Sequence, residues 1–69
     1  MSPLRLRLDV PDEAAGVRLD TFLAANHPGK SRSVWKRFIE DGRVAVDGSA
    51  AHKPGFALKP GMAIEATIP

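Results

Sequence analysis

The amino-acid sequence predicts a single α+β domain, in which two helices pack on one face of a small, mostly antiparallel sheet. One segment near each end of the chain alternates apolar and polar residues with the period of two that is typical of half-buried strands. Between them lie two segments with apolar residues at helical spacing and a third with a hairpin-turn signal. The expected order is therefore strand, helix, helix, hairpin, strand.

The length and composition restrict the chain to one small domain. Sixty-nine residues allow a single domain, 1–69, whose thin core gives modest stability. There is no cysteine, and His27 and His52 stand far apart without a carboxylate at metal-ligand spacing, so we expect neither a disulfide nor a metal site. No run approaches the roughly 18 apolar residues of a membrane span, and no secretory signal opens the chain. We therefore expect a monomeric, cytoplasmic protein without a cofactor.

The first half of the chain predicts a strand and a helix. Residues 4–10 alternate leucine or valine with charged residues, and Pro11 ends this strand. After a short acidic connector, a helix is expected over 17–26, because three apolar residues fall on one side of it. These residues are Leu19, Phe22 and Leu23.

The second helix, expected from Ser31 to Asp41, is the most amphipathic segment. Ser31 is a suitable N-cap, and Gly42 stands where a helix C-terminus favours a residue with positive φ. The apolar face comprises Val34, Trp35, Phe38 and Ile39, and the opposite face comprises Arg32, Ser33, Lys36, Arg37 and Glu40. Because Trp35 lies within the apolar face, we expect it in the core rather than stacked on a nucleobase.

The last third of the chain predicts a hairpin and a closing strand. Asp47-Gly48 is a signal for a type I′ turn, so residues 43–46 and 49–52 should pair. Pro60-Gly61 suits the centre of a type II turn. The alternation over residues 62–68 predicts a final strand. We expect this strand to pair with the first one, because their apolar positions are in phase.

Basic residues are concentrated in the second half of the chain. The total is ten Lys and Arg against eight Asp and Glu, a net charge of +2, which alone indicates little. Residues 30–59 hold seven basic and three acidic side chains, whereas residues 1–29 hold three basic and four acidic ones. The second helix adds a positive dipole end with Arg32, Lys36 and Arg37 on its polar side. This face either binds phosphate or is an ordinary solvated surface.

No segment predicts a catalytic centre. Ser31, Ser33 and Ser49 have no base beside them in a recognisable nucleophile motif. Asp20 stands near the start of a helix, where it favours the helix dipole and can pair with a nearby cation, so we interpret it as structural. The chain offers a binding surface, and we expect no enzymatic activity from it alone.

Several motifs together resemble the RNA-binding domain first seen in ribosomal protein S4. They are Val10 to Leu23 (VPDEAAGVRLDTFL), Ser31-Arg32-Ser33, Glu40 to Gly48 (EDGRVAVDG), Lys53-Pro54 and Leu58 to Glu65 (LKPGMAIE). The opening Val-Pro-x-Glu-Ala-Ala-Gly-x-Arg-Leu-Asp is similar to the N-terminal domain of the RluA/RluD-type pseudouridine synthases. The resemblance runs from about Leu4 to Pro69, nearly the whole chain.

The resemblance implies the alpha-L fold, in which two helices and a loop lie beside a small sheet. RNA is then bound mainly through the second helix and the following hairpin loop. The resemblance assigns RNA contact to Ser31, Arg32, Ser33, Lys36, Arg37 and Lys53. It assigns architectural roles to Arg18, Asp20, Gly42 and Gly48. The implied partner is structured ribosomal or transfer RNA, held mainly through its phosphates.

The chain also departs from the family pattern. Val34 stands where a basic residue is common, Trp35 where an aliphatic residue is usual, and Asp47 where asparagine often precedes the turn glycine. The synthase domain of such enzymes carries an Asp within His-Arg-Leu-Asp followed by Thr/Ser-Gly, and residues 17–22 lack both the His and the Gly. We therefore expect an N-terminal fragment of a longer enzyme, whose catalytic domain is absent and would be its partner in the same polypeptide.

Three hypotheses for function follow. The favoured one is an RNA-binding module that positions a uridine-isomerising domain on structured RNA. The second is a stand-alone, ribosome-associated RNA-binding protein, and the third is a protein-interaction module that uses a sheet edge. The salt dependence of binding distinguishes the third hypothesis from the other two, because phosphate contacts release counterions and make binding strongly salt-dependent.

Overall fold

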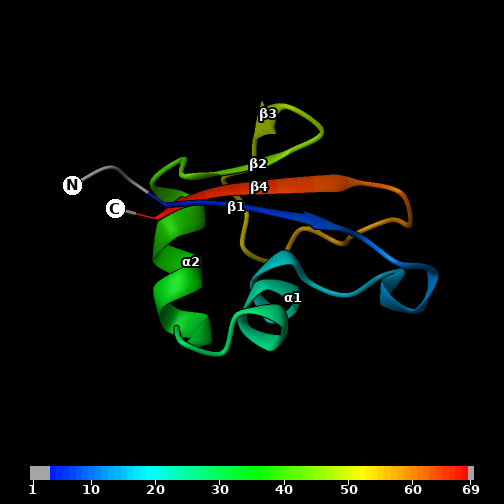
Figure 1. The fold of residues 1–69 in the computed structure, drawn as a ribbon, viewed down its shortest axis with the longest axis horizontal. Helices are drawn as coiled ribbons and strands as arrows, with labels where there is room; N and C mark the ends of the chain where they lie inside the picture. The colour runs from blue at the N-terminus through cyan, green and yellow to red at the C-terminus, as the bar shows by residue number, and fades with distance from the viewer. Residues whose placement is uncertain (1–3, 69) are drawn as a thin grey trace.

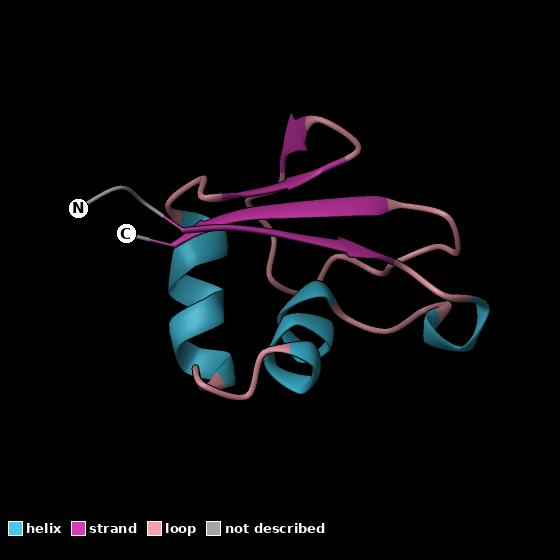
Figure 2. Cartoon of the chain, viewed as in Figure 1, coloured by secondary structure: helices cyan, strands magenta, loops and turns pink. Residues whose placement is uncertain are grey.

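The computed structural model describes residues 4–68, which form a four-stranded antiparallel sheet with both α-helices on one of its faces (Figure 1). The strands are β1 (Leu4–Asp9), β2 (Val44–Val46), β3 (Ser49–Ala50) and β4 (Ala63–Ile68), in the spatial order β1-β4-β2-β3. The helices are α1 (Leu19–Asn26) and α2 (Arg32–Glu40), and a short 3-10 helix, η1 (Asp12–Ala14), follows β1. Figure 2 shows the two layers, and the predicted α+β class and order of elements are confirmed.

The two terminal strands, β1 and β4, pair along their full length. The pairs that share the helix-facing side are Leu4 with Ile68, Leu6 with Ala66, and Leu8 with Ile64. All three β4 partners are buried, so the apolar alternation of the sequence faces the core as predicted. Leu4, the first residue of β1, is the exception and is 59% exposed.

The hairpin between β2 and β3 has the predicted type I′ turn. Asp47 and Gly48 have φ values of 51° and 83°, and this turn requires positive φ at both central positions. The Asp47 carboxylate also accepts a hydrogen bond of 2.9 Å from the N–H of Ala63 at the start of β4. The second hairpin strand is shorter than the predicted 49–52. The N–H of Ala51 still donates to the carbonyl of Val44, and the chain then turns where the N–H of Phe56 donates to the carbonyl of Lys53.

The predicted start of the first helix at Val17 is wrong, since α1 begins at Leu19. Val17 and Arg18 are extended instead, and they pair with a segment far along the chain. The carbonyl of Val17 accepts from the N–H of Leu58 at 2.9 Å, and Arg18 forms a β-bridge with Ala57. This non-local pairing takes the backbone groups that a longer helix would use.

The core forms where α1 and α2 meet the inner face of the sheet. Its fully buried side chains include Leu19, Leu23, Trp35, Ile39, Val44, Leu58 and Ile64. The Trp35 ring packs edge-on against Phe38, with ring centroids 5.7 Å apart, so the predicted core position of Trp35 is confirmed. Val34 was expected on the same apolar face but is 39% exposed, because it stands at the edge of the arc whose opposite edge is Ile39.

Removal of the Trp35 side chain should nearly unfold the domain. Trp35→Ala leaves a large cavity and should lower the free energy of unfolding by about 3–5 kcal/mol, a large part of the stability of so small a domain. Val34→Ala on the same helix is the control and should cost less than about 1 kcal/mol, since Val34 is partly exposed. Thermal unfolding measures both, and equal midpoints for the two variants would contradict the central place of Trp35.

Candidate nucleic-acid interface

The N-terminal end of α2 holds three of the six predicted contact residues. The N-cap Ser31 is extended, and its hydroxyl oxygen accepts from the N–H of Val34 at 3.3 Å, as the sequence predicted. The N–H groups of Arg32 and Ser33 lie in the first turn, where helix geometry provides no intrahelical acceptor. This end of α2 therefore keeps exposed donors and a partial positive charge, both of which favour an anion.

A basic face runs along α2 from this end. Arg32, Lys36 and Arg37 are exposed, whereas Trp35 between them is fully buried. Arg32 and Lys36 are four residues apart, so they are neighbours along the helix surface. None of the three forms an ion pair with any residue of the range 4–68. Their charges are therefore available to a ligand.

Lys30 adds a fourth cation beside this helix, although the sequence interpretation left it outside the interface. Its Nζ lies 5.7 Å from the centroid of the Phe38 ring, within the range of a cation–π contact. The sequence shows the charge of Lys30 but not its place, because the turn at Pro28-Gly29 decides where it lies relative to α2.

Lys53 is the one predicted contact residue that lies outside α2 and its N-cap. It is exposed and follows His52, whose ring lies against Gly42, just past the C-terminal end of α2. A β-carbon on Gly42 would be 3.2 Å from Cε1 of His52, and φ of Gly42 is 80° as predicted. The nine-residue helix is about 13 Å long, so Ser31 and Lys53 belong to opposite ends of an elongated surface. Such a surface suits a polymer better than a small molecule.

The start of α1 contains a buried carboxylate, and its backbone is hydrogen-bonded to the loop that follows β3. Nε and Nη2 of Arg18 each donate to the carboxylate of Asp20 at 3.1 Å, and Asp20 is 1% exposed. The backbone N–H of Asp20 donates to the carbonyl of Pro54, and that of Leu19 donates to the carbonyl of Phe56. These hydrogen bonds join the start of α1 and this loop into one structural unit. The predicted pairing of Asp20 with a cation is confirmed.

Loss of the Asp20 carboxylate should loosen this unit. Asp20→Ala removes the acceptor for Arg18 and for the N–H of Thr21, and should cost about 2 kcal/mol in unfolding free energy. The cost stays moderate because the Arg18 side chain is 56% exposed and remains hydrated. Asp12→Ala, which removes an exposed carboxylate, serves as the control in urea unfolding. If both variants unfold at the same urea concentration, Asp20 has no structural role.

The described residues include neither a metal-binding cluster nor a membrane-spanning helix. Within residues 4–68, no three His, Asp or Glu side chains gather in a way that could hold a metal ion. Neither α1 nor α2, with eight and nine residues, is long enough to cross a membrane. What α2 presents is a set of hydrogen-bond donors and positive charges, the combination that proteins use to bind the nucleic-acid backbone.

The fold and the basic face of α2 define a small RNA-binding module. Residues 17–64 match the S4 domain family, which is more than half of the chain. The chain belongs to the S4 domain family, as its sequence motifs indicated.

Three relatives of this chain are named as RNA pseudouridine synthases. The uncharacterized RNA pseudouridine synthase YlyB of Bacillus subtilis is 31% identical over 65 residues, which are 94% of this chain and 21% of that protein. An uncharacterized RNA pseudouridine synthase of Aquifex aeolicus is 36% identical over 62 residues (90% and 20%). A third, from Chloroflexus aurantiacus, is 40% identical over 60 residues (87% and 19%). The chain spans about a fifth of the length of these relatives.

Proposed function

We propose that this chain is the RNA-binding domain of a pseudouridine synthase, and that it positions the synthase domain on structured ribosomal or transfer RNA. The observation that carries the proposal is the exposed basic face of α2, in an S4 domain whose matched relatives are named as RNA pseudouridine synthases. The synthase domain belongs to the same polypeptide, and the protein acts as a cytoplasmic monomer.

In this proposal α2 binds the RNA backbone. A phosphate accepts from the N–H groups of Arg32 and Ser33 at the helix N-terminus, where the dipole favours negative charge. The Arg32 guanidinium can bind a phosphate with two parallel hydrogen bonds, and Lys36 supplies a point charge one turn further on. Lys53 would reach the backbone from the other end of the helix. Such contacts set register and orientation and carry no sequence information.

The domain itself needs no catalytic residue for this role. An enzyme that alters a base within folded RNA has to take the base out of its stack, and a separate pocket must receive it. That pocket and the isomerase chemistry belong to the synthase domain. The names of the three relatives favour this division of labour over a stand-alone ribosome-associated protein.

Substitution of the basic face should weaken RNA binding without harming the fold. In the variant Arg32→Ala/Lys36→Ala/Arg37→Ala, each lost phosphate contact should lower the slope of log affinity against log salt by about 0.7–0.9. The thermal midpoint should stay close to that of the wild type, because all three side chains are exposed. Affinity for a structured ribosomal RNA fragment, measured at several salt concentrations, gives the slope.

Lys59→Ala is the matched control for Lys36→Ala, since each removes one exposed positive charge and Lys59 lies outside α2. Lys36→Ala should weaken binding and reduce its salt dependence more than Lys59→Ala does. If the triple variant keeps wild-type affinity and slope, α2 is only a solvated face and the assigned interface is wrong.

The chain alone should form no pseudouridine. RNA incubated with the purified 69-residue chain is digested to nucleosides and examined for pseudouridine by mass spectrometry after cyanoethylation. The same RNA without protein is the control. Formation of pseudouridine above that control would overturn the division of labour between the two domains.

A further inference from the structure

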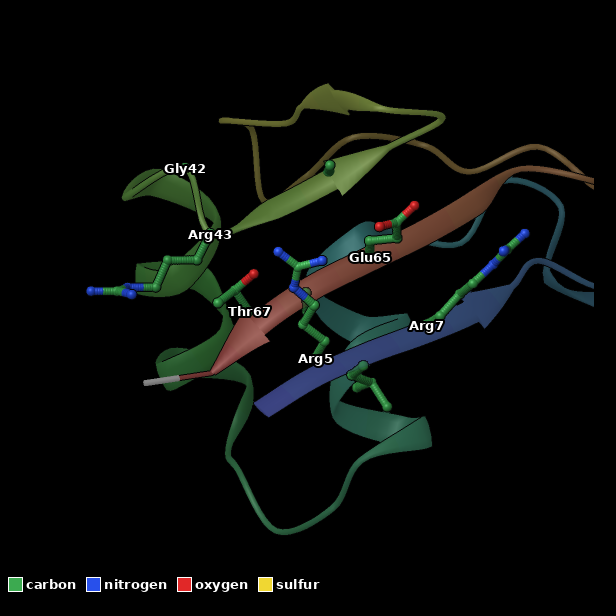
Figure 3. A pocket seen from close by; sticks show the side chains of 9 residues that line it. Arg5, Arg7, Gly42, Arg43, Glu65 and Thr67 are labelled. Carbon is green, nitrogen blue, oxygen red and sulfur yellow. The ribbon is translucent and has the colours of Figure 1, made fainter. Parts of the chain in front are cut away.

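The face of the sheet that points away from the helices carries a second group of basic side chains. Arg5 and Arg7 alternate with the leucines of β1 and therefore point to this outer face. Arg43, between α2 and β2, stands at its other side. With Glu65 and Thr67 of β4, these residues line a hollow of about 400 Å³ (Figure 3).

The three guanidinium groups are spread out rather than gathered at one point, and that of Arg43 points away from Arg5, toward the side of α2 (Figure 3). In Figure 3 they follow one another in the order Arg43, Arg5, Arg7, with Arg5 lying between Thr67 and Glu65. Arg5 is directly opposite Thr67 in the β1–β4 register, which places the hydroxyl donor beside that guanidinium. A row of separate cations suits the successive phosphates of one strand better than a single small anion.

Few carboxylates neutralise this row. Neither Arg5 nor Arg43 forms an ion pair with any residue between 4 and 68. Arg7 lies 3.8 Å from Asp9, but both side chains are largely exposed, and such a pair contributes little. Glu65 is the one carboxylate that lines the hollow. Asp9 follows the same alternation as Arg5 and Arg7, so three guanidinium groups stand against two carboxylates, Asp9 and Glu65, on this face. The outer face is positive by one charge, and arginine is the side chain best shaped to bind phosphate.

Arg43 connects the outer face to the C-terminal end of α2, where Glu40 and Asp41 are also exposed. Arg43 follows the helix after only Asp41 and Gly42, and its backbone N–H donates to the carbonyl of Phe38 at 3.0 Å. The carbonyl of Arg43 accepts from the N–H of Thr67, which fixes the same residue to β4. Arg43 therefore stands at the junction between the C-terminal end of α2 and the outer side of the sheet.

We infer that the outer sheet face is a second RNA-backbone site, and that the bound RNA continues from α2 past Arg43 onto Arg5. This inference rests on the proposed RNA-binding function and extends its footprint to a face that the six predicted residues do not include. The polar lining and the cations without ion-pair partners favour an RNA backbone over a protein partner, whose docking surface needs an apolar centre.

The test uses a structured ribosomal RNA fragment and single-charge variants of the chain. Arg5→Gln and Arg43→Gln should each weaken binding and lower the salt slope by about 0.7–0.9, because each removes one phosphate contact. Lys59→Gln removes the same charge from an exposed position outside the hollow and should have a smaller effect on both quantities. Thermal midpoints show whether each variant is folded.

A substitution that should strengthen RNA binding makes the test independent of folding, because a loss of folding can only weaken binding. Glu65→Gln removes the carboxylate from the hollow and should tighten RNA binding, whereas Glu13→Gln, on η1, should tighten it less. A purely structural role for Glu65 gives no reason for tighter binding. Unchanged or weaker binding of Glu65→Gln relative to Glu13→Gln contradicts the inference.

Parallel measurement of the α2 triple variant separates the two proposals. If the α2 variant binds weakly while Arg5→Gln and Arg43→Gln match Lys59→Gln, the outer face is not an RNA site and the proposed function stands. That result would leave the outer face as a surface for a protein partner. If the wild-type chain binds no RNA at any salt concentration, the proposed function fails and this inference fails with it.

Discussion

Burial of Trp35 and Ile39 against the core fixes the orientation of α2, and the binding surface depends on that orientation. Both side chains are fully buried, so the opposite side of the helix must face solvent. Arg37 stands on that side, two residues from each of the buried pair, whereas Arg32 and Lys36 are exposed at its flank. A rotation of α2 that exposed its basic residues differently would bring Trp35 into water, and the apolar area lost would exceed the gain from any one surface contact.

The alternation of side chains in β4 determines which residues of the sheet face the helices and which face outward, as helical periodicity does for the two sides of α2. Ile64, Ala66 and Ile68 are buried under the helices, and the residues between them, Glu65 and Thr67, are left for the outer face. Because β4 pairs with both β1 and β2, its register also decides which residues of those strands share that face. One central strand thus sets the core and the composition of the outer surface together.

Features that depend on neighbouring residues could be predicted from the sequence. The type I′ turn at Asp47-Gly48, the Ser31 cap and the in-phase terminal strands each follow from a short motif or a period. Features set by contacts between residues far apart in the sequence could not be predicted. The late start of α1 depends on pairing with residues 57–58, and the place of Lys30 depends on the Phe38 ring. The outer face joins β1 to the end of α2, which no local pattern connects.

The kinds of side chain on these surfaces limit what the domain can read in an RNA. Trp35, the one aromatic residue of α2 besides Phe38, is fully buried, so it presents no ring on which a base can stack. Phe38 is half-buried, with its ring packed against Trp35 and Lys30 beside it. Phe56 is 37% exposed and lies in the loop after β3 rather than on either basic face. Guanidinium and ammonium groups without stacking partners bind phosphates whatever the sequence. Under the proposed function, a domain built in this way follows the course of an RNA backbone and leaves selection of the target uridine to the proposed synthase domain.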